Sequence, residues 1–216
     1  MNIQELKDLQ PLVYQQFVTI LEQGRLAHAY LFSGDFASFE MALFLSQALF
    51  CQEKVGVHPC GKCRSCRLIE SNDFSDVTIV APQGNFIKTD TIRELVKNFS
   101  QSGFESSQQV FIIRDAEKMH VNAANSLLKV IEEPQSTIHI FLLTNQEEAV
   151  LPTIKSRTQI ISFPQNLPYL ERFLEEEGLL KTQASLIARL VSSQGWLQTN
   201  RLLTCWIKRK SLQNCF

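Results

Sequence analysis

The sequence lacks the hydrophobic segments that membrane insertion needs. No apolar run approaches the length of about eighteen residues of a membrane-spanning helix, and the first ten residues, MNIQELKDLQ, lack the apolar core of a signal peptide. An excess of either charge is also missing, since 21 Lys and Arg stand against 22 Asp and Glu, for a formal net charge of -1 over 216 residues. We therefore expect a globular cytoplasmic protein that makes no membrane contact. A general nucleic-acid coat would be strongly basic, so that class is disfavoured.

Cysteine is scarce outside one short segment. Four of the six cysteines fall in the spacing C-x8-C-x2-C-x2-C, at Cys51, Cys60, Cys63 and Cys66. Disulfides are not expected in a reducing compartment, and four closely spaced thiolates with no open position predict a structural Zn²⁺ site. A catalytic zinc would keep a position for water, and His58 is not needed to complete four ligands. Four free thiols are the alternative interpretation, whereas Cys205 and Cys215 are expected to be ordinary thiols.

Short apolar runs alternate with helical patterns along the chain. The runs VFII (110–113) and IHIFLL (138–143) are joined by a helical pattern that Pro134 ends, which predicts two parallel strands with a crossover helix. Upstream we expect a helix over 11–23, a strand over 28–34, a helix over 38–50, a strand over 76–82 and a helix that a capping box of Thr91 and Glu94 opens. The pattern predicts an α/β fold with a doubly wound parallel sheet. Functional residues are expected beyond the carboxyl ends of the strands, at Arg114, Asp115, Thr144 and Asn145.

A change of composition after the last predicted strand indicates two domains. The spacer PQNLP (164–168) separates a core domain over 1–163, which includes the cysteine segment 51–66, from a small helical domain over 164–216. In the second domain we expect helices over 168–178, 182–191 and 197–208.

The segment after the first predicted strand has the layout of a phosphate-binding loop but not its residues. Such a loop needs G-x-x-x-x-G-K-[ST], because glycine admits the phosphate, lysine supplies charge and the hydroxyl holds Mg²⁺. Counted from Gly34, the last three positions are Phe39, Glu40 and Met41. All three requirements fail together, so we expect this chain to bind no ATP and the loop to be an ordinary turn between strand and helix.

Several motifs together resemble the clamp-loader subunits of bacterial DNA polymerase III, which are AAA+ proteins. They are HAYLFSG, the four-cysteine spacing, NAANSLLKVIEEP, FLLTN and IKSRTQII, and the resemblance covers about residues 10 to 200. It implies an AAA+ core with a small helical lid. Active members carry a complete phosphate loop, an Asp-Glu pair after the central strand and an arginine in the lid. Here Ala116 follows Asp115, and Gln198 stands near the lid position, so the pattern resembles the non-hydrolysing delta-prime subunits rather than the gamma/tau motor.

The resemblance gives Arg157 a role that its position alone does not. Beside Lys155, an exposed arginine would by itself be interpreted as an ordinary surface residue. In the family, the arginine of a Ser-Arg-Cys motif projects into the ATP site of the neighbouring subunit. The matching residues here are Ser156, Arg157 and Thr158. Arg157 is thus expected to be an arginine finger in trans, with Thr158 departing from the family's cysteine.

The resemblance also implies partners and a process. We expect a subunit without ATPase activity of its own that acts with gamma/tau and delta subunits, and indirectly with the beta sliding clamp, to load the clamp at primed DNA. Family members continue into a third helical collar domain, so the end at Phe216 is expected to reflect a fragment or a truncated reading frame. An active ATPase of the gamma/tau type is the main alternative. A zinc-dependent DNA-binding module is disfavoured by the weak local charge of the cysteine segment.

Overall fold

A five-stranded parallel sheet forms the centre of the molecule. The structure, a computed structural model, describes residues 3–82, 84, 86–99, 108–133 and 137–190. The strands, in the order in which they lie across the sheet, are β2 (Val77–Val80), β3 (Gln108–Ile113), β4 (Thr137–Thr144), β1 (Ala29–Ser33) and β5 (Gln159–Ser162). Every pairing between neighbours is parallel. The predicted α/β class and the β3–helix–β4 crossover are therefore confirmed.

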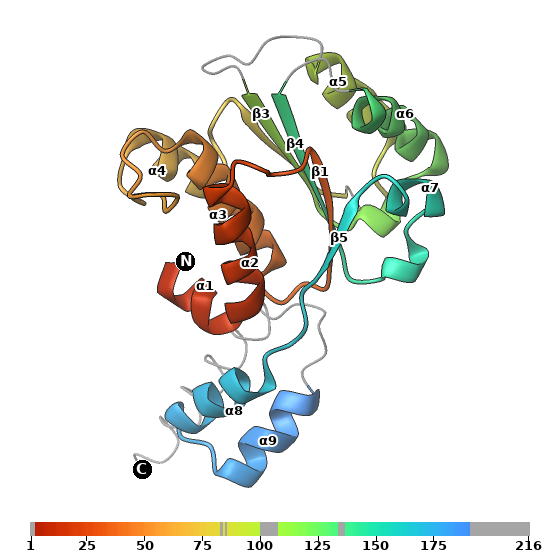
Figure 1. The fold of residues 1–216 in the computed structure, drawn as a ribbon. Coiled ribbons are helices and arrows are strands. Elements are labelled where there is room, and N and C mark those ends of the chain that lie inside the picture. The colour runs from red at the N-terminus through yellow and green to blue at the C-terminus, as the bar shows by residue number, and fades with distance from the viewer. Residues whose placement is uncertain (1–2, 83, 85, 100–107, 134–136, 191–216) are drawn as a thin grey trace.

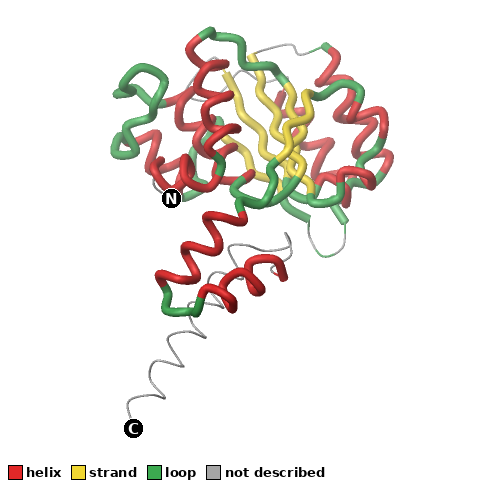
Figure 2. The backbone as a smooth tube through the Cα atoms, turned by 60° about the horizontal axis from the view of Figure 1, so that its bottom comes forward, coloured by secondary structure: helices red, strands yellow, loops and turns green. Residues whose placement is uncertain are grey.

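Helices cover both faces of the sheet (Figure 1). One face carries α1 (Ile3–Leu9), α2 (Pro11–Glu22) and α3 (Ser38–Phe50), and the other carries α5 (Thr89–Phe99), α6 (Val121–Glu132) and α7 (Pro152–Lys155). A single-turn 3-10 helix, Ala116–Lys118, follows β3, and another, Glu147–Ala149, follows β4. Figure 2 shows the sheet between these two helical layers. Both layers are apolar toward the sheet, which explains why the strands have continuous apolar sequences.

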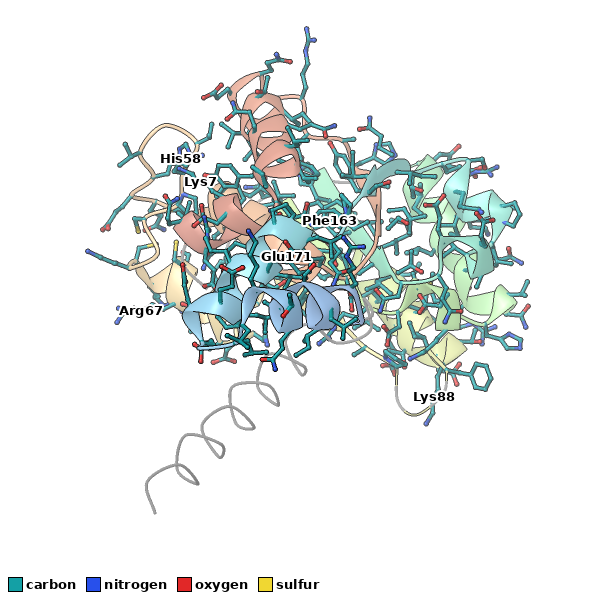
Figure 3. All side chains as sticks on the ribbon, turned by 90° about the horizontal axis from the view of Figure 1, so that it is seen from below. Lys7, His58, Arg67, Lys88, Phe163 and Glu171 are labelled. Atoms are coloured by element: carbon teal, nitrogen blue, oxygen red, sulfur yellow. The ribbon has the colours of Figure 1, made fainter. Side chains whose placement is uncertain are left out.

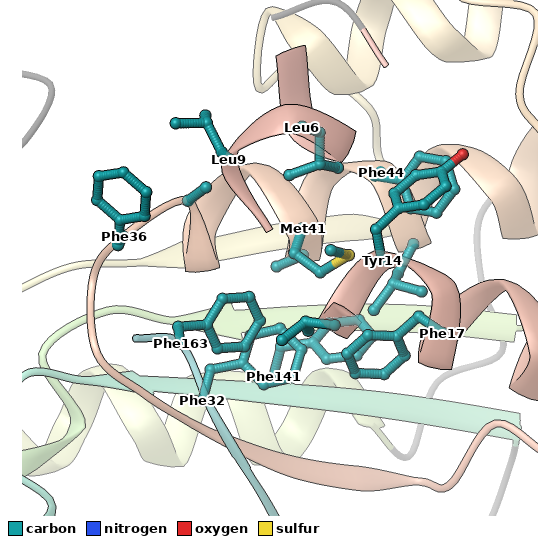
Figure 4. Packing of buried hydrophobic residues seen from close by; sticks show 14 of the residues in the cluster. Leu6, Leu9, Tyr14, Phe17, Phe32, Phe36, Met41, Phe44, Phe141 and Phe163 are labelled. Atoms are coloured by element: carbon teal, nitrogen blue, oxygen red, sulfur yellow. The ribbon is translucent and has the colours of Figure 1, made fainter. Parts of the chain in front are cut away.

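Side chains alternate between the two layers along each strand. Tyr30 and Phe32 of β1 belong to the cluster under α2 and α3, whereas Leu31 belongs to the cluster under α5 and α6. The first cluster is rich in aromatic rings, as Figure 4 shows for the residues around Met41. Phe32 lies 4.7 Å from Phe163 and 5.5 Å from Phe141, measured between ring centroids. Phe163 also lies against Gly34, the residue that follows β1, so this cluster supports the turn after the strand.

Two short helices were not predicted, and one local prediction is wrong. Helix α1 and helix α4 (Arg64–Glu70) were not expected from the sequence, since each has only seven residues and too short a periodic pattern. The predicted capping box is wrong because α5 begins at Thr89, which places Thr91 inside the helix. Helix boundaries are the least certain part of a prediction from pattern.

Two further helices follow the sheet. Helices α8 (Leu167–Glu176) and α9 (Lys181–Leu190) pack together through buried Leu170, Leu174, Ala184 and Ala188. The Asn166 side chain donates hydrogen bonds to the carbonyl oxygens of Asp8 at 2.9 Å and Leu9 at 3.2 Å, so the start of α8 is tied to the N-terminal helices. The expected helix over 197–208 and Gln198 lie outside the described residues. Among the described helices, none combines the length and the apolar character that crossing a membrane would require.

The turn after β1 depends on Gly34. This residue has φ +105°, and a Cβ placed on it would lie 2.4 Å from the carbonyl oxygen of Phe163. We expect Gly34→Ala to lower the free energy of unfolding by about 3 kcal/mol, since it adds a backbone clash to a strained φ. Gly24→Ala is the matched control, because Gly24 also has a positive φ of +63° but no atom within 4 Å of the added Cβ. Urea denaturation measures both variants, and equal losses would show that the close approach to Phe163 does not matter.

Candidate functional site

The loop between β1 and α3 is fixed by a buried side chain and by hydrogen bonds from Gln10. Phe36 is 2% exposed, and Ala37 adopts the left-handed conformation at φ 64° just before α3 begins. The buried side chain of Gln10 donates hydrogen bonds of 2.8 Å to the carbonyl oxygens of both Phe36 and Pro164. One amide therefore links the loop, the N-terminal helices and the segment that enters α8.

The three positions that should bind phosphate and Mg²⁺ are occupied by unsuitable groups. Met41 is 0% exposed and packs in the aromatic cluster, at the position of the Mg²⁺-binding hydroxyl (Figure 4). The Arg114 guanidinium lies over the Phe39 ring, 4.8 Å from its centroid. Burial raises the pKa of Glu40, and its own backbone N–H and the Arg114 guanidinium offset only part of this effect. Two apolar side chains and a carboxyl group thus stand where a phosphate site has glycine, a hydroxyl and a lysine.

The raised pKa of Glu40 leads to a prediction on stability. Because the folded chain holds this proton more tightly than the unfolded chain, the free energy of unfolding falls as the pH rises from about 4.3 through the raised value. We therefore expect Glu40→Gln to raise the free energy of unfolding at pH 7, with a difference from the wild type that disappears below about pH 4. Thermal unfolding as a function of pH is the measurement. Glu148→Gln is the control, because the Glu148 side chain is 98% exposed, and a loss of stability in Glu40→Gln at pH 7 would contradict the assignment.

At the carboxyl ends of β3 and β4, two of the predicted polar residues contact the 3-10 helix Ala116–Lys118. Asp115 has φ 51° and forms an ion pair of 3.0 Å with Lys118. Thr144, which is buried, donates a hydrogen bond of 2.7 Å to the Glu117 carboxylate. Glu117 was missed by the sequence prediction because it lies beyond the expected Asp-Glu pair. Ala116, at the second position of that pair, is buried and brings no carboxylate to this edge.

The four predicted cysteines converge on one point. Their sulfur atoms all lie within 4.8 Å of one another, and Sγ of Cys63 is 3.9 Å from Sγ of Cys51. Four sulfurs around one Zn²⁺ in a tetrahedron would lie about 3.8 Å apart, given Zn–S bonds of about 2.3 Å. Backbone N–H groups of Cys60, Lys62 and Cys63 point at sulfur atoms of the cluster at 3.2 to 3.4 Å. Such donors stabilise thiolates, so the donor set fits a metal ion.

The environment affects the thiols differently. Burial raises the pKa of Cys66 and of Cys51. Burial acts in the same direction on Cys63, but hydrogen bonds from neighbouring backbone and thiol groups outweigh it and lower its pKa to about 7. A bound cation would favour the thiolate form of all four groups.

The cysteine segment packs on the helical layer over the sheet. Cys51 caps the end of α3, and the Gln47 side chain donates a 2.9 Å hydrogen bond to the carbonyl oxygen of Cys66. The Tyr14 ring of α2 lies 6.1 Å from the ring of His58 and 5.2 Å from Nζ of Lys7. Figure 3 shows His58 and Lys7 on the same flank of the molecule. The segment thus connects to the fold at several points.

Arg157 follows the short helix α7, on the same face of the sheet as α6. Its Nε atom donates to the Glu132 carboxylate, and its Nη1 atom donates to the carbonyl oxygen of Thr153 at 3.1 Å and to the Ser156 hydroxyl at 3.2 Å. The side chain is 38% exposed. Thr158, where the family has cysteine, donates a 3.0 Å hydrogen bond to the carbonyl oxygen of Ile154. The sequence placed Arg157 on the surface but did not identify its carboxylate partner.

The sequence of this chain is similar to subunits of bacterial DNA polymerase III. A family model described as "DNA polymerase III, delta subunit" matches residues 9–166. This chain belongs to the delta-prime family of clamp-loader subunits. DNA polymerase III subunit delta' of Bacillus subtilis is 38% identical over 192 residues, which are 88% of this chain and 58% of that protein. The Escherichia coli subunit delta' is 30% identical over 83% of this chain and 55% of its own length. The chain therefore spans a little more than half the length of these delta-prime relatives.

A gamma/tau subunit and two solved structures are also similar to this chain. DNA polymerase III subunit gamma/tau of Mycobacterium tuberculosis is 33% identical over 76% of this chain and 30% of its own length. The crystal structure of a DNA polymerase III gamma subunit-related protein from Thermotoga maritima has a TM-score of 0.52 at 24% identity, over 88% of this chain and 64% of that chain. Thermotoga maritima RuvB has the same TM-score at 11% identity, over 84% and 55%. These likenesses support the AAA+ fold.

Proposed function

We propose that this chain is a clamp-loader subunit that hydrolyses no ATP itself and supplies Arg157 to the ATP site of an adjacent gamma/tau subunit. The proposal depends on the contrast between the segment after β1, which lacks the groups of a phosphate site, and Arg157, which is exposed. After β1, Phe36 of the loop and Met41 of α3 are buried and Phe39 of α3 is partly buried, whereas the guanidinium of Arg157 lies at the surface. A planar, permanently charged guanidinium suits the stabilisation of a transferring phosphoryl group.

Each feature of the chain's own loop argues against ATP hydrolysis. A bound triphosphate would meet the Glu40 carboxyl group at the position of the lysine and the buried Met41 thioether at the position of the Mg²⁺ ligand. Ala116 stands where an acid would orient the attacking water. The gamma/tau-type alternative is therefore disfavoured on chemical grounds.

The proposed process is the loading of the sliding clamp onto primed DNA, together with gamma/tau and delta subunits. The family membership and the gamma/tau relatives support this assignment. We also propose that the four cysteines hold one structural Zn²⁺, with no open position for a reaction.

Two measurements test the proposal. The chain is mixed with the gamma/tau and delta subunits, and ATP turnover is followed with and without primed DNA and the beta clamp; we expect the chain to raise turnover in the presence of DNA. Separately, a fluorescent ATP analogue is titrated into the chain alone, and we expect no saturable binding at micromolar concentrations. Binding of the analogue, or turnover that does not depend on the chain, would overturn the proposal.

A further inference from the structure

The guanidinium of Arg157 is fixed along one edge. Glu132 accepts from Nε, while Thr153 and Ser156 accept from Nη1. Within the described part of the chain, no hydrogen bond to Nη2 is found. The contacts therefore orient the planar group and leave one amino group to meet an external oxyanion.

Glu132 occupies a position that helix physics does not favour. It is the last residue of α6, where the helix dipole places partial negative charge and disfavours a carboxylate. The residue that it meets lies 25 positions further along the chain, beyond β4 and α7. Since local helix energetics disfavour an acid here, the pairing with Arg157 gives a reason for its presence.

Both partners stand on fixed backbone. Ile131, next to Glu132, is 1% exposed, and Ile154, three residues before Arg157, is 0% exposed. These two residues belong to the same buried cluster between the sheet and the helices α5, α6 and α7. The hydrogen bond from Thr158 to the carbonyl oxygen of Ile154 secures the end of α7. The distance between the two backbones is thus set by the core.

We propose that Glu132 is a positioning residue for Arg157, which holds the guanidinium in the orientation that an adjacent ATP site requires. This inference rests on the proposed function of Arg157. A side chain that is held before the partner arrives loses less conformational freedom in the transition state, and small misplacements of a reacting group are costly in rate. In this role Glu132 makes no contact with the reacting groups and acts through Arg157.

The pair contributes little to folding. The side chains of Arg157 and Glu132 are 38% and 46% exposed, and ion pairs this accessible to water are weak. Removal of Glu132 should therefore leave the thermal unfolding temperature of the chain within about 2 °C of the wild type. A change in turnover then reports on the orientation of Arg157.

The first test uses turnover in the mixture of this chain with gamma/tau, delta, clamp and primed DNA. We expect Glu132→Ala to lower kcat about tenfold with KM for ATP within about twofold, since the neighbour still binds its nucleotide. Glu132→Gln keeps an oxygen that accepts from Nε and is expected to recover at least about half of the lost kcat on a logarithmic scale. Glu148→Ala is the control, since it removes a carboxylate paired with Lys155 on the same surface and should leave kcat unchanged.

The second test uses the chain alone. In ¹⁵N-detected NMR spectra the Nε–H signal of Arg157, assigned with Arg157→Lys, is expected to be resolved and protected from exchange in the wild type and in Glu132→Gln, and to be averaged in Glu132→Ala. An unprotected signal in the wild type, or an unchanged signal in Glu132→Ala, would overturn the inference.

The outcomes separate this inference from the proposed function. If Arg157→Ala lowers turnover and Glu132→Ala does not, Glu132 is not a positioning residue and the function stands. If Arg157→Ala has no effect on turnover, the proposed function fails, and the positioning role fails with it.

Discussion

Replacement of Arg157 by alanine is expected to lower the DNA-stimulated ATP turnover of the mixed complex about a thousandfold. The substitution removes a guanidinium that stands ready at the end of α7, fixed by Glu132, Thr153 and Ser156. It removes no buried group, so the fold and the metal content of the cysteine segment should not change. Steady-state turnover with saturating ATP, primed DNA and clamp is the measurement.

Two further variants make this result specific. Arg157→Lys keeps the positive charge but loses the planar donor arrangement, and it should recover only a small part of the lost turnover. Lys155→Ala removes the neighbouring cation, which pairs with Glu148 at 3.8 Å, and should leave turnover within about twofold of the wild type, since Arg157 keeps its own contacts. Turnover that survives in Arg157→Ala would show that Arg157 is an ordinary surface residue.

Replacement of Cys63 by serine is expected to remove the metal ion. One ligand of a closed four-thiolate site is lost, so the metal content should fall from about one equivalent of zinc to nearly none. The segment 51–66 has few apolar side chains of its own, and the ion would supply much of its folding energy. We expect a loss of a few kcal/mol and a Tm lower by about 5 to 10 °C for a chain of this size.

Elemental analysis after dialysis and differential scanning calorimetry check this prediction. Cys205→Ser is the control, since Cys205 lies far from the cluster in sequence and outside the described residues. A full equivalent of zinc in Cys63→Ser would show that the ligands were chosen wrongly. Removal of zinc from the wild type by a strong chelator should lower the Tm by a similar amount.

The strands and most of the helices could be predicted because their signals are local. Continuous apolar runs such as VFII and IHIFLL mark strands buried on both faces, and the parallel register of β3 with β4 follows that expectation. Helices α1 and α4 escaped prediction because seven residues carry too little periodicity. The start of α5 was misplaced because Thr91 and Glu94 satisfy a capping pattern inside the helix.

Two features of the candidate sites could be predicted from residue types and their spacing: the cysteine cluster and the altered phosphate-binding loop. The cysteine spacing by itself indicated which four thiols meet, because Cys60, Cys63 and Cys66 follow one another at intervals of three positions in a turn and Cys51 is nine positions before the first of them. The replacement of glycine, lysine and hydroxyl by Phe39, Glu40 and Met41 likewise needed no coordinates, because it can be seen in the sequence that the residues of a phosphate-binding loop are missing from these positions.

Only the tertiary structure decided how distant segments meet. It paired Glu132 with Arg157, joined Gln10 to the carbonyl oxygens of Phe36 and Pro164, and brought Gly34 against the backbone of Phe163. The partners in these contacts lie 25 to 154 positions apart in sequence. Their geometry depends on how the helices pack on the sheet, and no local pattern of residues encodes that packing.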